Sequence, residues 1–152
     1  MPKVAILTGS KSDLPILDAA VATLTSFNIE HEVHVMSAHR APAKVQEFAS
    51  SAADNGFEVI IAAAGMAAHL PGVIAAQTTL PVIGVPVASD NSGVSGLDSL
   101  LSIAQMPPGI PVACMAVNGG KNAALYAISI LALKYPDIAT KLGEFRREQA
   151  SK

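Results

Sequence analysis

Short apolar runs alternate along this chain with longer segments in which apolar residues recur at the spacing of a helix face. Apolar runs of about four to eight residues are typical of buried strands, and the longer periodic segments are typical of helices. The sequence therefore predicts strands at residues 3–8, 30–36, 57–64, 81–85 and 112–117. It predicts helices at residues 14–24, 42–55, 69–77, 97–105, 122–135 and from 137 toward the C-terminus.

The regular alternation of strand and helix indicates the fold class. Strands that are joined by helices pair in parallel, with right-handed crossovers and helices on both faces of the sheet. Residues 57–64 form a continuous apolar run, which is expected of a strand buried on both faces. We therefore expect an α/β fold, a three-layer α/β/α sandwich with a parallel, doubly wound sheet of flavodoxin-like or Rossmann-like layout. The helix at 122–135 is apolar almost all round, which predicts that it is buried.

No linker, repeat or low-complexity segment divides the 152 residues, a length typical of one domain. The formal net charge of −2 and the pI of about 6.0 give no sign of binding to nucleic acid or to an anionic membrane. Cys114 is the only cysteine, which excludes a disulfide within the chain, and the histidines lack the spacing of a zinc site. The first residues do not have the pattern of a secretion signal, so we expect a cytoplasmic protein.

The centre of the chain is almost free of charge. Between Glu58 and Lys121 the only charged residues are Asp90 and Asp98, although about a quarter or more of an ordinary protein surface is charged. A membrane segment is excluded, because glycine and proline interrupt the region too often for about 20 continuous lipid-facing residues. We therefore expect other subunits to cover much of this surface, in a homo-oligomer with large interfaces.

Polar side chains follow the first two predicted strands at the point where each strand ends. Gly9-Ser10-Lys11-Ser12-Asp13 follows the first strand, and Ser37-Ala38-His39-Arg40-Ala41-Pro42 follows the second. Open α/β sheets bind ligands at this edge. Arginine suits a phosphate and histidine suits proton transfer near neutral pH, so Arg40 and His39 indicate chemistry on a phosphorylated small molecule.

Each of these segments also has a simpler interpretation. Residues 9–13 are consistent with an ordinary turn in which Asp13 or Ser12 caps the next helix, and they match neither a Walker loop nor the dinucleotide-binding fingerprint. Ser37 is also a candidate cap. His69 follows the third strand, and a buried histidine bonded to a carbonyl is a common alternative to a ligand-binding one. Lys121 faces either a ligand or an interface, and the sequence does not decide between them.

Five segments, in order along almost the whole chain, resemble the bacterial PurE family of 5-(carboxyamino)imidazole ribonucleotide mutases; they are residues 9–13, 37–42, 67–72, 79–87 and 97–107. The resemblance implies an isomerase that forms 4-carboxy-5-aminoimidazole ribonucleotide in purine (IMP) biosynthesis, without ATP, a metal or an organic cofactor. It implies one catalytic domain, residues 1–152, in a homo-octamer with active sites near subunit boundaries. The C-terminal helix, at about 137–150, would pack on neighbouring subunits. A transient contact with the ATP-dependent synthetase that makes the substrate is left open.

The resemblance also implies roles for individual residues. His39 falls on the family's catalytic histidine, which acts as general acid and base. The implied substrate-binding residues are Ser10, Asp13, Ser37, Arg40, Gly65, Ala67, His69 and Leu70, of which the last four match a segment that lines the pocket for the base and the carboxylate. This chain departs from the family pattern at Ala63 and Met66, which replace two glycines, and at Lys121.

Two other functions fit parts of the sequence. A related carboxylase joins free CO₂ to aminoimidazole ribonucleotide, but His39-Arg40 and residues 69–72 favour the mutase. A non-catalytic flavodoxin-like module would hold a flavin phosphate at residues 8–12. The chain has no tryptophan, however, and Tyr126 and Tyr135 lie on the helix that we expect to be buried, so no ring is available to stack on a flavin.

Overall fold

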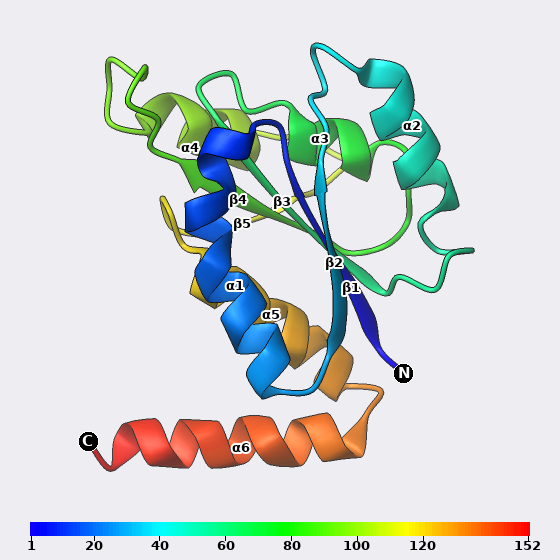
Figure 1. Ribbon diagram of the computed structural model, residues 1–152, viewed down its shortest axis with the longest axis vertical. Coiled ribbons are helices and arrows are strands. Elements are labelled where there is room, and N and C mark those ends of the chain that lie inside the picture. Colours follow the sequence, from blue (N-terminus) through cyan, green and yellow to red (C-terminus); the bar gives the residue numbers. More distant parts are fainter.

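Five parallel strands form one sheet in the computed structural model, which describes all residues from Met1 to Lys152. The strands are β1 (Lys3–Thr8), β2 (Glu30–Val35), β3 (Val59–Gly65), β4 (Val82–Val87) and β5 (Ala113–Cys114). Their order across the sheet is β2-β1-β3-β4-β5, and every neighbouring pair is parallel (Figure 1). The chain runs from β1 to β2 on one side and returns to β3 on the other, so the strand order reverses between β1 and β3.

Helices cover both faces of the sheet (Figure 1). One face carries α1 (Leu14–Ser26), which follows the short 3-10 helix η1 (Lys11–Asp13), and α5 (Gly120–Ala132), against which α6 (Pro136–Ala150) packs. The other face carries α2 (Pro42–Ser51), α3 (Leu70–Ala75) and α4 (Leu97–Ala104). The expected three-layer α/β/α sandwich with a parallel, doubly wound sheet is confirmed.

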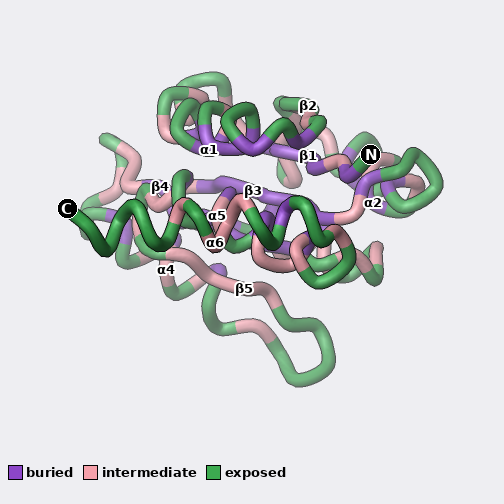
Figure 2. Tube along the Cα trace, turned by 90° about the horizontal axis from the view of Figure 1, so that it is seen from below, coloured by how far each residue is buried: buried purple, intermediate pink, exposed green.

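Alternate residues of β1 enter two separate cores. Val4 and Ile6 pack with α1 and α5, whereas Ala5 and Leu7 pack with the helices of the opposite face, and all four are fully buried. Figure 2 shows the buried stretches of the chain between the two helix layers. Burying one valine, leucine or isoleucine side chain stabilises a fold by about 1.5–3 kcal/mol. This burial stabilises the central strands, so the loops at their carboxyl ends are attached to a rigid part of the fold.

The largest differences from the sequence-based expectation concern three elements. β5 pairs over only two residues, Ala113–Cys114, rather than over 112–117, and α2 ends at Ser51 rather than at residue 55. The helix expected at 122–135 is α5, and its expected burial is correct for one face only, because Tyr126 is 45% exposed. The buried positions of α5 instead form one face, at Gly120, Ala123, Ala124, Ala127, Ile128 and Leu131. No helix, α5 included, combines the length and apolar character needed to span a membrane.

Candidate active site

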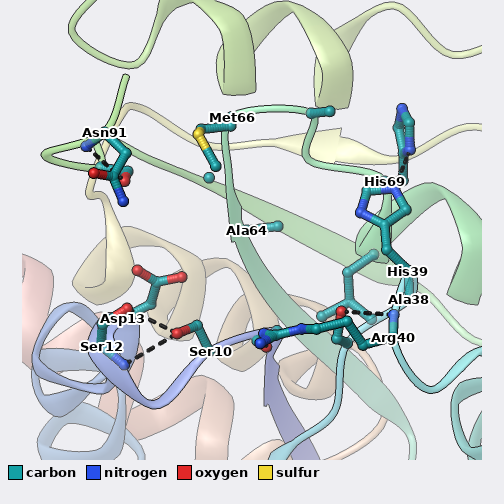
Figure 3. A pocket seen from close by; sticks show the side chains of 16 residues that line it. Ser10, Ser12, Asp13, Ala38, His39, Arg40, Ala64, Met66, His69 and Asn91 are labelled. Carbon is teal, nitrogen blue, oxygen red and sulfur yellow. Dashed lines mark hydrogen bonds between the residues drawn. The ribbon is translucent and has the colours of Figure 1, made fainter. Parts of the chain in front are cut away.

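A cavity of about 520 Å³ opens at the carboxyl ends of β1, β2, β3 and β4, where the strand order reverses. This volume lies within the range of small-molecule sites. Every site residue predicted from the sequence lines it: Ser10, Asp13, Ser37, His39, Arg40, Gly65, Ala67, His69 and Leu70 (Figure 3). The topology thus gathers three segments that lie far apart in the sequence around one space.

The loop between β1 and α1 presents two hydroxyls and a carboxylate to the cavity (Figure 3). The Oγ atoms of Ser10 and Ser12 lie 2.8 Å apart, and Ser10 Oγ accepts a hydrogen bond from the backbone N–H of Ser12, so Ser10 caps η1. Asp13 is the N-cap residue of α1, as the simpler interpretation predicts, but its side chain makes no capping hydrogen bond. Burial raises the pKa of Asp13, and hydrogen bonds from Thr8 and Ser12 only partly oppose this. Because it makes no capping bond, the carboxylate of Asp13 retains acceptor capacity for ligand hydroxyls.

Arg40 joins the second strand end to the first. Its Nη2 donates a hydrogen bond of 3.0 Å to the carbonyl oxygen of Gly9, and its backbone N–H donates one of 3.1 Å to Ser37 Oγ. Ser37 is not the cap residue of α2, which is Ala41, so its interpretation as a helix cap is wrong; Ser37 closes its own turn and lines the cavity. A guanidinium has five N–H donors, so most of them remain available beside the Ser10 loop for an anion such as phosphate.

Two histidines meet at the other side of the cavity. His39 Nε2 and His69 Nδ1 lie 2.6 Å apart, with the two rings nearly perpendicular at 81° (Figure 3). His69 is exposed and bonds no carbonyl, so its interpretation as a buried structural histidine is wrong. In such a bond one nitrogen carries the proton and the other accepts it. The two rings therefore share one proton at this contact.

Sequence reasoning missed two polar residues of the cavity, Ser89 and Asn91. They follow β4 just as the predicted segments follow their strands, but no site residue was predicted in this loop. Lys121, which the sequence left undecided, lies outside the cavity, with its Nζ 5.9 Å from the ring centre of Phe145 on α6. No group of three or more His, Cys, Asp or Glu side chains is arranged to hold a metal ion.

Comparison with known proteins identifies the family of this chain. The AIR carboxylase family model matches residues 3–152. The N5-carboxyaminoimidazole ribonucleotide mutase of Pyrococcus abyssi is 55% identical over 148 residues, which are 97% of this chain and 84% of that protein. The mutase of Thermotoga maritima is 53% identical over 146 residues, 96% of this chain and 84% of that protein. The crystal structure of Treponema denticola PurE superposes with a TM-score of 0.89 at 28% identity, covering 99% of this chain and 93% of that one. The chain therefore belongs to the AIR carboxylase family and, within it, to the PurE-type N5-carboxyaminoimidazole ribonucleotide mutases, isomerases of purine biosynthesis.

Proposed function

We propose that the cavity performs the mutase reaction with His39 as its general acid and base. The carboxylate moves from the exocyclic nitrogen of the imidazole to a ring carbon. The N–C bond breaks, its electron pair stays on the nitrogen, and the nitrogen takes up a proton. The ring carbon then attacks the released CO₂ and loses its own proton. One proton is added and one is removed, so a single group that first donates and then accepts suffices, and the balance requires no ATP, metal or organic cofactor.

The contact between His39 and His69 is the observation that carries this proposal. Histidine is the side chain that most readily gains and loses a proton near neutral pH. The short bond from His39 Nε2 to His69 Nδ1 orients the ring of His39, whose Nδ1 has no hydrogen-bond partner in the chain. We infer that His69 acts through His39 as a positioning residue, and that Nδ1 of His39 faces the heterocycle.

Arg40, Ser10 and Ser12 are the proposed anchor for the phosphate of the nucleotide, and Asp13 is the proposed acceptor for ribose hydroxyls. The guanidinium of Arg40 is already held beside the Ser10 loop by its bond to Gly9. Binding the remote phosphate and ribose keeps the imidazole in place while its carboxylate exists as free CO₂. The nucleotide therefore does not need to rebind between the two halves of the reaction.

The wall that β3 contributes suits the flat base and the CO₂. Gly65 and Ala67 have no large side chain, so the base can approach the backbone, and Leu70 forms a buried apolar floor. An added Cβ at Gly65 would lie 3.3 Å from Ser89 Cβ, which leaves little room for a larger residue. Such a wall excludes water from the site where CO₂ is released.

The same proposal includes a homo-octamer, with α6 packed on neighbouring subunits. Large apolar side chains at Leu97, Leu101 and Leu133 are 51%, 49% and 90% exposed, which supports their coverage by other copies. Only Ile138 of α6 is buried within the chain. We expect light scattering to give about eight times the chain mass of 15.5 kDa, and a monomer would contradict the assembly. The lone Cys114 is consistent with our placement of the enzyme in the cytoplasm.

The experiment that tests the function supplies each possible substrate separately. Purified protein is given 5-(carboxyamino)imidazole ribonucleotide without bicarbonate, or aminoimidazole ribonucleotide with bicarbonate, and formation of the C-carboxylated product is followed. We expect rapid conversion of the first and slow conversion of the second. Conversion of only the second would instead favour the carboxylase.

A further inference from the structure

Met66 has an unusual backbone conformation for its residue type. It follows the last residue of β3 and has a φ of +49°, in the left-handed region. The other non-glycine residues with positive φ are Asn28, Ser95 and Asn118, and asparagine tolerates this region far better than methionine does. Glycine would fit here without strain. Strained residues persist mostly where they serve a function, so the side chain itself is the feature to explain.

Met66 is the only apolar residue lining the cavity whose side chain is both long and exposed. The hydrophobic residues that line the cavity are Ala38, Ala64, Met66, Ala67 and Leu70. The alanines are too short to reach across it, and Leu70 is only 2% exposed. Met66 is 46% exposed and lies on the opposite side of the cavity from Ser10 and Arg40 (Figure 3). It is therefore the one long apolar side chain that is free to move over the opening.

We propose that Met66 covers the cavity and keeps released CO₂ beside the ring carbon, an inference that rests on the function proposed above. Once the N–C bond has broken, with its electron pair and a proton on the nitrogen, CO₂ is neutral and carries no charge that Arg40 or a backbone N–H could hold. It stays only if apolar groups enclose it until the ring carbon attacks. Methionine is unbranched and has three rotatable bonds, so it can admit the nucleotide and then close over the small molecule.

The test measures how much CO₂ escapes in each turnover. The wild type, Met66→Gly and Met66→Ala convert substrate labelled with ¹³C in its carboxylate, in the presence of unlabelled bicarbonate. The readouts are the labelled fraction of the product and the amount of aminoimidazole ribonucleotide released. We expect both variants to lose CO₂ on the order of tenfold more often than the wild type. This factor is the lower end of the range for the loss of one apolar contact in a pocket. Met66→Leu, which restores an apolar side chain of similar size, is expected to retain the label.

Two controls distinguish the enclosure of CO₂ by Met66 from the relief of backbone strain and from failure of the proposed mutase function. Asn28→Gly relaxes another positive φ, at +57°, in the turn before the amino end of β2 and away from the cavity, and is expected to leave label retention unchanged. Met66→Gly is compatible with the native backbone, so we expect it to fold with at least the wild-type Tm. Equal label retention in the wild type, Met66→Gly and Met66→Ala would overturn the proposal while the mutase function stands. A wild type that converts no labelled substrate would instead refute the proposed function.

Discussion

Replacing His69 with phenylalanine removes the hydrogen bond that His39 makes with another side chain, while an aromatic ring of similar size remains at the start of α3. The bond is short, at 2.6 Å, and it gains charge assistance when His39 carries its proton. A hydrogen bond to a charged group is worth about 1.5–3 kcal/mol. At about 1.4 kcal/mol per factor of ten, its loss predicts a fall in kcat of about 10- to 150-fold.

The division of this effect between kcat and KM is the informative result. Steady-state kinetics of His69→Phe should show the fall in kcat with little change in KM, because His69 positions the proton carrier rather than the nucleotide. The double variant His39→Asn/His69→Phe should be no slower than His39→Asn alone, because residues that act as a unit are not additive. An unchanged kcat, or an effect on KM alone, would refute the positioning role and return His69 to the substrate-binding residues.

Three further predictions concern binding and stability. Arg40→Ala should raise KM about tenfold or more with a smaller effect on kcat, because it removes a charge-assisted contact to phosphate. The control Lys44→Ala, on the exposed side of α2, should leave both KM and kcat unchanged. Equal KM values for Arg40→Ala and the wild type would contradict the phosphate anchor. Asp13→Asn should raise Tm at neutral pH, because burial raises the pKa of Asp13 and so disfavours the ionised native state. Asp13 and its asparagine replacement are both neutral in strong acid, so the difference in Tm should vanish as the pH falls below the ordinary value of 3.8 and grow as the pH rises from there through the raised pKa; a difference that grows in acid would contradict this. Gly120→Ala should lower the free energy of unfolding, measured in urea, by about 1–3 kcal/mol, because its Cβ would collide with the carbonyl oxygen of Ile16 where α5 crosses α1. An unchanged urea midpoint would show that the two helices separate easily.

The sequence predicted the location of the site because that location follows from topology. Once β1 and β3 are identified as neighbouring parallel strands, the segments that follow them must meet at one edge of the sheet. The same rule applies to β4, and applying it there would have included Ser89 and Asn91. The segments were thus predictable, whereas the contacts between their side chains were not. The bond between His39 and His69 joins residues 30 positions apart, and its existence depends on ring orientations that no spacing reveals.

The shortness of β5 has a local cause. Asn118 donates its backbone N–H to the carbonyl oxygen of Pro86, so Pro86 faces the β5 side of β4. A proline has no N–H to return to the neighbouring strand, so regular pairing stops after Cys114. The apolar run at 112–117, in which no residue is fully buried, could not reveal that the partner strand lacks a hydrogen-bond donor.

The sequence analysis predicted neither the exposed face of α5 nor the positive φ of Met66, and the reasons differ. Alanine and isoleucine fill almost every side of α5, so composition could not distinguish the face that packs on α1 from the face that carries Tyr126. A positive φ is expected at glycine, and the one indication at this position was that Met66 replaces a glycine of the family pattern. That replacement does not by itself show that the methionine keeps the glycine-like backbone.

Turnover of His39→Asn tests most directly whether His39 carries the proton. The variant should bind the ribonucleotide with nearly the wild-type Kd, because its phosphate and ribose contacts are intact, yet its kcat should fall by at least about 10²-fold, the lower limit for loss of a proton-transfer group. Retained binding together with near-normal conversion would show that another group carries the proton.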